Sequence, residues 1–202
     1  MFYLGLDLGK KQDFSALAVV ERTQHRELVV RYLERAPLGT PYTKVVQRVA
    51  ELTRHPNLNG RCHLTVDATG LGVPVVELLS AAQMGTRAIT AVTITGGNRA
   101  RQASGFGLGE HWNVPKVDLI GGLQVALERG ELKIVKAMRE SGTLVRELIR
   151  MRTRRRKAAA EDGDGGAWFD SGTEHDDLVL GVSLGCWQAG RPLNGMGTQR
   201  LF

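Results

Sequence analysis

Aspartates stand at the ends of three apolar segments, and this arrangement constrains the fold of the chain more than any other feature. The apolar segments cover 2–9, 61–67 and 178–187, and the aspartates at their ends are Asp7, Asp67 and the adjacent pair Asp176 and Asp177. A carboxylate on a buried strand is costly to desolvate unless it has a partner. Three such sites in one chain indicate a shared partner, and a hard divalent cation with oxygen ligands is the obvious one.

The first third of the chain predicts a short antiparallel meander. Alternating and continuous apolar residues predict strands over 2–9, 15–22 and 27–34. The polar link 23–26 is short enough to join the second and third strands as a hairpin.

The next segments predict helix–strand repeats. Pro41 begins a helix of apolar periodicity that His55-Pro56 ends, and strands over 61–67 and 87–94 flank a helix over 72–84. Strands separated by helices in this way form parallel crossovers. We therefore expect an α/β fold with a mixed β-sheet, an antiparallel three-strand meander plus parallel strands, and helices on both faces.

The rest of the chain has weaker signals. Segment 95–114 carries five glycines and little periodicity, which predicts a long loop. Three helices are expected later, over 116–129, 137–150 and 174–188, with a return strand over 167–170. We expect one domain over 1–190 and a flexible, glycine-rich tail over 191–202.

A basic run follows the expected helix 137–150. Five of the six residues in 152–157 are basic, and the chain carries a net charge of +6. The run continues a helix that bears Arg139, Arg146 and Arg150, so it is either a solvated helix end or a contact to a DNA backbone. The candidate DNA-binding residues are Arg150, Arg152, Arg154, Arg155, Arg156 and Lys157.

Each aspartate also has a structural interpretation. Asp7 is alternatively a turn residue, or the neighbour of a phosphate loop as in sugar kinases and actin-like ATPases. Asp67 could cap the helix that follows it. For Asp176, the spacing from Thr173 resembles a capping box, and acids favour a first helical turn. Asp13 is either an accessory acid or a hairpin turn residue.

The sequence gives little support for nucleotide-binding, zinc or membrane-spanning sites. The glycines after Asp7 and Asp67 complete neither a Walker A loop nor a dinucleotide-binding fingerprint. Cys62 and Cys186 match no zinc spacing, which favours reduced thiols. No apolar run approaches the roughly 20 residues that span a membrane, and no signal peptide is evident, so we expect a cytoplasmic protein without a membrane partner.

Taken together, five short motifs resemble the nuclease domain of a phage terminase large subunit, in the RNase H-like superfamily. They follow the family's order along the chain, and the His-Asp-Asp-Leu motif is the most specific of them. The motifs are Leu4-Gly5-Leu6-Asp7-Leu8-Gly9 with Asp13-Phe14-Ser15-Ala16, Val66-Asp67-Ala68-Thr69-Gly70-Leu71-Gly72, Val114-Pro115-Lys116-Val117-Asp118-Leu119-Ile120, Gly130-Glu131-Leu132-Lys133-Ile134, and Glu174-His175-Asp176-Asp177-Leu178-Val179-Leu180.

This resemblance implies an endonuclease that hydrolyses DNA phosphodiester bonds with two Mg²⁺ or Mn²⁺ ions. Asp7, Asp67 and Asp176 would be the catalytic metal ligands, with Asp177 alongside, and Asp7 would bridge both ions. Segment 152–168 would match the family's β-hairpin near the DNA path.

Two further residues are candidates for accessory roles. Lys116 would neutralise charge on a phosphate or lie in solvent, and His175 would touch the site or lie in solvent.

The resemblance also implies partners. These are double-stranded DNA, a packaging ATPase domain, the small terminase subunit and the portal, in the cytoplasm of a bacterial host. Terminase large subunits carry an N-terminal packaging ATPase that these 202 residues lack, so we expect an excised domain or a stand-alone relative.

Other functions stay open at this point. They are a RuvC-like resolvase, an actin-like or sugar-kinase-like nucleotide-binding half-domain, and a non-catalytic DNA-binding module. Metal-dependent cleavage of DNA without nucleotide would separate a nuclease from the last two.

Overall fold

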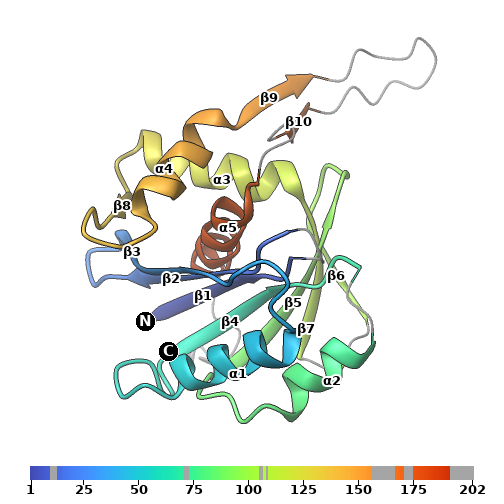
Figure 1. The fold of residues 1–202 in the computed structure, drawn as a ribbon. Helices are drawn as coiled ribbons and strands as arrows, with labels where there is room; N and C mark the ends of the chain where they lie inside the picture. Colours follow the sequence, from blue (N-terminus) through green and yellow to red (C-terminus); the bar gives the residue numbers. More distant parts are fainter. Residues whose placement is uncertain are drawn as a thin grey trace, which may run out of the picture.

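A mixed β-sheet with helices on both faces forms the structure (Figure 1). The computed structural model describes residues 1–9, 13–70, 73–104, 107, 109–155, 167–170 and 175–191. The strands are β1 (Phe2–Asp7), β2 (Ala16–Arg22), β3 (Leu28–Arg35), β4 (Cys62–Asp67), β5 (Ala88–Thr95), β6 (Arg101–Ala103), β7 (Glu110–Pro115), β8 (Leu132–Ile134), β9 (Arg152–Arg155) and β10 (Ala167–Asp170). The helices are α1 (Tyr42–Thr53), α2 (Val73–Ala81), α3 (Lys116–Glu128), α4 (Ser141–Arg150) and α5 (Asp177–Gly190).

The main sheet has the strand order β6-β7-β5-β4-β1-β2-β3-β8. β1, β2 and β3 pair antiparallel, whereas β4, β5 and β7 continue from β1 in parallel. The predicted meander and the predicted parallel crossovers are therefore confirmed. The carboxyl ends of β1, β4, β5 and β7 consequently meet at one edge of the sheet, where sites in open α/β sheets collect.

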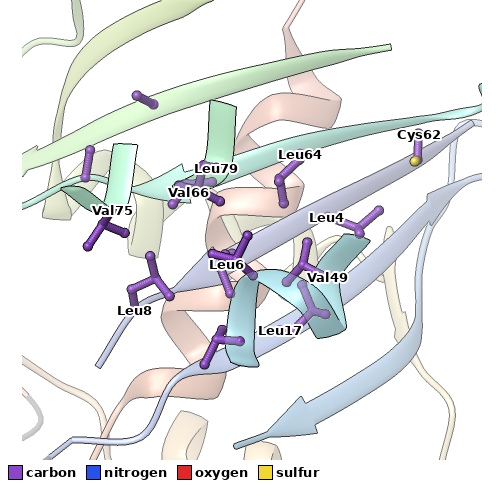
Figure 2. Close-up of a cluster of buried hydrophobic side chains, with 14 of the residues drawn as sticks. Leu4, Leu6, Leu8, Leu17, Val49, Cys62, Leu64, Val66, Val75 and Leu79 are labelled. Carbon is purple, nitrogen blue, oxygen red and sulfur yellow. The ribbon is translucent and has the colours of Figure 1, made fainter. Parts of the chain in front are cut away.

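Apolar side chains fill both faces of the sheet. Helices α1 and α2 cover one face, and α3, α4 and α5 cover the other (Figure 1). Figure 2 shows the core on the α1–α2 face, in which leucines of β1, β2 and β4 meet Val49 of α1 and Leu79 of α2. β1 is thus buried on both sides, which explains its near-continuous apolar sequence.

Helix α5 packs unusually close to β1 because the contact is made by glycines. A Cβ atom on Gly5 would lie 1.9 Å from the carbonyl oxygen of Gly181, which no side chain tolerates. One turn further along α5, a Cβ on Gly185 would lie 3.1 Å from the carbonyl oxygen of Tyr3. The helix therefore runs antiparallel to β1, and its first residue, Asp177, lies toward the end of the strand that carries Asp7.

The prediction of a long loop over 95–114 is wrong. This segment contains β6 and most of β7, which pair antiparallel with each other while β7 extends the parallel part of the sheet. Among the described residues, two of the glycines that suggested a loop lie between β6 and β7. Gly107 and Gly109 have positive φ angles, and a Cβ on Gly109 would lie 2.7 Å from the carbonyl oxygen of Ile89. They form the turn between two short strands that are too polar to show a period.

The prediction that the basic run continues a helix is also wrong. α4 ends at Arg150, Met151 has an extended conformation, and β9 follows and pairs antiparallel with β10. A helix would place arginines three and four residues apart on one face, where like charges repel. The hairpin implied by the family resemblance is the arrangement found, and Figure 1 shows it projecting from the helical layer of α3 and α5.

Smaller differences concern element ends. β8, a strand of three residues that pairs in parallel with β3, was not predicted. α4 begins at Ser141 rather than 137, since the Ser141 hydroxyl donates to the carbonyl oxygens of Lys136 and Met138 and closes a turn there. Of the tail expected over 191–202, Arg191 is anchored between the rings of Trp112 and Trp187, and 192–202 lie outside the described residues.

None of the helices in the described part of the chain combines the length and the apolar character that crossing a membrane requires.

Candidate active site

Sheet register brings Asp7 and Asp67 together. β1 and β4 are parallel neighbours, and Leu6 pairs with Val66, so the next residue of each strand is an aspartate. Both carboxylates thus stand at the carboxyl edge of the sheet. The prediction that these two residues come together needed only the strand order and the position of each acid at a strand end.

Asp176 and Asp177 reach the same edge through α5. The antiparallel packing of this helix on β1 places its first turn near Asp7. Asp177 is 5% exposed and raises the pKa of Asp7 by charge repulsion, as does Asp176. The four predicted acids therefore form one acidic cluster.

Asp7 lies at the centre of this cluster without a hydrogen-bond partner among the described residues. Its side chain belongs to a residue that is 8% exposed, and no side chain or backbone group in the described ranges donates a hydrogen bond to its carboxylate. Burial raises the pKa of Asp7 well above its ordinary value, and the charges of Asp67, Asp177 and Asp176 raise it further, whereas Lys116 opposes them. A buried, unpaired carboxylate must bind a proton or a cation.

Asp67 is oriented by its own loop. Its Oδ1 atom accepts a hydrogen bond of 2.8 Å from the backbone N–H of Thr69, which is an Asx turn. The Thr69 hydroxyl in turn accepts a bond of 2.8 Å from the backbone N–H of Ile94 in β5. α2 begins only at Val73, so Asp67 does not cap that helix.

Asp176 is the N-cap residue of α5 but does not cap it. Its side chain makes no capping hydrogen bond, and its Oδ2 atom instead accepts a bond of 2.6 Å from Lys116 Nζ. Lys116 is the first residue of α3, at the end of β7. The ammonium group therefore lies in the acidic cluster rather than in free solvent.

Asp177 is bound by an arginine that sequence reasoning missed. Arg35 Nη2, at the end of β3, donates to Asp177 Oδ2 at 2.9 Å and to Glu147 Oε1 at 3.0 Å. The pKa of Asp177 is raised by its burial, and the bond from Arg35 opposes that rise. Glu147 lies in α4, where burial raises its pKa to about 7.

No sequence pattern marked Arg35 or Glu147. They are separated by 112 residues, and each stands among other charged residues in the chain. The only signal was periodicity, because Glu147 follows Leu144 by three residues on the buried face of α4. A charged residue on an apolar helix face calls for a buried partner.

His175 and Asp13 lie at the rim of the cluster. His175 Nδ1 is 3.8 Å from Asp177 Oδ2 and 3.9 Å from Asp13 Oδ1, and its ring meets Phe14 edge to face. Both side chains are exposed, and Asp13 stands in the connection between β1 and β2. His175 is thus solvent-exposed and also lies beside Asp177, whereas Asp13 lies in the connection of the β1–β2 hairpin, beside His175.

The predicted DNA-binding residues divide into two groups. Arg150 ends α4, and Arg152, Arg154 and Arg155 belong to β9, in which Arg154 pairs with Trp168 of β10. Arg156 and Lys157 lie outside the described residues.

The donor set fits a hard divalent cation. It consists of carboxylate oxygens, which Mg²⁺ and Mn²⁺ prefer, and the central one is buried without a partner. Across the described ranges, however, no three such side chains already converge as a finished coordination shell. Two of the carboxylates are bound by cationic side chains instead, Asp176 by Lys116 and Asp177 by Arg35. The residues thus provide ligands that a cation could draw together.

The charge state of Asp7 predicts how stability depends on pH in EDTA. Because the pKa of Asp7 is higher in the folded than in the unfolded protein, its proton stabilises the fold below the ordinary pKa of about 3.9. This contribution is lost as the pH rises through the raised pKa. Asp7→Asn, which is neutral at every pH, should therefore melt above the wild type near neutral pH.

The difference in melting temperature should shrink as the pH falls toward about 3, where Asp7 is largely protonated in both states. Thermal melting followed by circular dichroism at both pH values measures it. Asp118→Asn, at an exposed position in α3, is the control and should change little. A difference for Asp7→Asn that is equal at both pH values would show that the carboxylate is not destabilised by burial.

Comparison with known proteins shows similarity at the level of structure. No protein-family model and no curated protein matches the sequence. The large terminase nuclease of the thermophilic phage G20c aligns with a TM-score of 0.63 at 21% identity, over 93% of this chain and 82% of that one. The large terminase of bacteriophage HK97 aligns with a TM-score of 0.60 at 13% identity, over 92% of this chain and 38% of that one.

A third structure, the large terminase nuclease domain of bacteriophage SPP1 with bound Mn, has a TM-score of 0.56 at 10% identity. It aligns over 93% of this chain and 85% of that domain. At such low sequence identities, the similarity shows a shared fold and nothing more. The chain therefore has the RNase H-like fold of the nuclease domains of viral terminases.

Proposed function

We propose that the protein is a divalent-metal-dependent endonuclease that hydrolyses phosphodiester bonds of DNA. The observation that carries this proposal is Asp7, a buried carboxylate that has no partner among the described residues and is surrounded by three other carboxylates. Such a site is unfavourable without a cation. The fold supports the same conclusion, because the similar structures are terminase nucleases and one of them holds Mn.

Each acid has a separate role in this proposal. Asp7 would be a ligand of both ions, since it lies between the strand that carries Asp67 and the helix that carries Asp176 and Asp177. Asp67 would hold one ion, and the two aspartates of α5 would hold the other. Two bound Mg²⁺ or Mn²⁺ ions would stabilise the attacking and the leaving oxygen of an in-line displacement.

Charged residues around the acids would support the reaction. Lys116 neutralises Asp176 in the protein alone and supplies a positive charge for a phosphate when DNA is bound. His175 lies beside Asp177 and Asp13 at the exposed rim, where DNA would approach. These two residues and Asp13 are therefore accessory rather than metal-binding.

The basic hairpin would hold double-stranded DNA. β9 carries Arg152, Arg154 and Arg155, and it follows Arg150 at the end of α4. β10, its partner, leads toward α5 and lies against α3, whose first residue is Lys116. The hairpin therefore follows α4, which carries Glu147, and precedes α5, which begins with the acids of the cluster.

Genome packaging is the biological setting that we propose. In it the domain would act with a packaging ATPase domain, a small terminase subunit and a portal, in the cytoplasm of an infected cell. The chain aligns with 38% of the HK97 large terminase, so that protein contains further parts beyond the aligned region.

DNA cleavage tests the proposal. The wild type should cut plasmid DNA with Mn²⁺ or Mg²⁺ and without nucleotide, and it should be inactive in EDTA. Asp7→Asn should reduce the rate at least about a hundredfold, as expected for loss of charge at the centre of a metal site, while its far-UV circular dichroism stays native. Asp118→Asn should cut at the wild-type rate.

Full activity of Asp7→Asn would contradict the metal assignment, and activity that requires ATP would favour a nucleotide-binding half-domain. Rates on linear duplexes and four-way junctions should be compared in the same assay. A strong preference for junctions would favour a resolvase over a packaging nuclease.

DNA binding without sequence preference is the second expectation. Replacing Arg154, Arg155 and Arg156 together by Gln should weaken binding in EDTA. It should also flatten the slope of log K against log salt by about 0.9 for each phosphate that the protein no longer neutralises. Fluorescence anisotropy at several salt concentrations measures the slope.

A matched control replaces three arginines at the other edge of the sheet. Arg54, Arg61 and Arg87 lie near the end of α1 and the beginnings of β4 and β5. This triple variant has the same change in net charge and should keep the slope. Equal effects of the two triple variants would show that only overall charge matters.

A further inference from the structure

The first turn of α5 has an unusual arrangement of hydrogen bonds. An N-cap side chain normally accepts a bond from the backbone N–H two or three residues later. Asp176 makes no such bond, and its carboxylate is held by Lys116. The N–H of Val179 is instead bound by Glu147 Oε2 of α4, at 3.1 Å. Glu147 thus caps α5 in place of Asp176, and the Asp176 carboxylate lies in the acidic cluster.

Arg35 connects this capping contact to Asp177. A single nitrogen, Nη2, donates both to Glu147 Oε1 and to Asp177 Oδ2. The guanidinium also lies over the ring of Phe14, 4.2 Å from its centroid. Arg35 is therefore fixed by the β1–β2 connection, α4 and α5 at once.

We propose that Arg35 and Glu147 are positioning residues of the proposed nuclease, which set the orientation of the two aspartates at the start of α5. The inference rests on the proposed function. Both polar contacts of the Asp177 carboxylate with described residues, the bond from Arg35 and the approach of His175, involve Oδ2. In Asp176, Oδ2 is likewise the atom bound by Lys116. In the described part of the chain the other oxygen of each aspartate makes no hydrogen bond, so it would be available to a cation.

This arrangement corresponds to the outer shell of a metal site. Groups that hydrogen-bond to a ligand fix its orientation, and their loss typically weakens metal binding about 10- to 100-fold. A buried ion pair that served only stability would affect the unfolding temperature and leave the affinity of a folded protein for metal unchanged. Metal affinity therefore distinguishes the two roles.

The experiment compares Glu147→Met with the wild type. Methionine has a similar length and removes both the cap of Val179 and the partner of Arg35. Calorimetric titration with Mn²⁺ should show an affinity about 10- to 100-fold lower. Cleavage should require correspondingly more Mn²⁺, while DNA affinity in EDTA should equal that of the wild type.

Two further variants provide the controls. Glu51→Met changes a helical glutamate that pairs with Arg48 on the α1 face of the sheet, and its Mn²⁺ affinity should be that of the wild type. Glu147→Gln keeps an oxygen for Val179 N–H but loses the charge that pairs with Arg35. It should recover part of the Mn²⁺ affinity, and it replaces Glu147→Met in the comparison if circular dichroism shows that the methionine variant is unfolded.

The possible results distinguish a failure of the positioning role from a failure of the proposed function. Wild-type Mn²⁺ affinity in a folded Glu147 variant, even one with a lowered melting temperature, would overturn the positioning role and leave the nuclease proposal intact. A wild-type protein that neither binds Mn²⁺ nor cuts DNA would overturn the proposed function and this inference with it.

Discussion

The close packing of α5 on β1 is the constraint on which the candidate site depends. Because Gly5 has no side chain, the backbone of the helix at Gly181 can lie directly against the strand. This contact fixes the direction of α5 and brings its first turn to the carboxyl end of β1. Without it, Asp176 and Asp177 would not approach Asp7 and the acidic cluster would not form.

The negative charge of the acidic cluster is compensated by groups at its edge rather than at its centre. Lys116 holds Asp176, Arg35 holds Asp177, and the backbone of Thr69 holds Asp67, whereas Asp7 has no such partner among the described residues. Asp7 is therefore the carboxylate of the cluster whose burial is least compensated by a described neighbour. A cation that binds there stabilises the folded state by mass action, so the same feature that costs stability would provide affinity for metal.

Much of the fold and of the acidic cluster could be predicted from sequence, because the informative residues lie at the ends of strands and helices. Apolar runs and short links predicted the meander and crossovers, and strand order alone placed Asp7 beside Asp67. The residue pattern did not predict β6, β7 and β9 because their residues are polar or basic and owe their conformation to pairing, although the family resemblance implied the hairpin of β9 and β10. Arg35 and Glu147 were missed because a buried ion pair between distant elements has no local pattern.

The most direct test of the metal site is a crystal soaked in Mn²⁺, with diffraction data collected at the manganese absorption edge. Anomalous scattering locates the ion independently of any assumption about its ligands. The account predicts a peak in contact with the Asp7 carboxylate, with Asp67 or the aspartates of α5 completing the oxygen ligands. A crystal with no peak at Asp7, or with manganese bound only elsewhere on the surface, would contradict it.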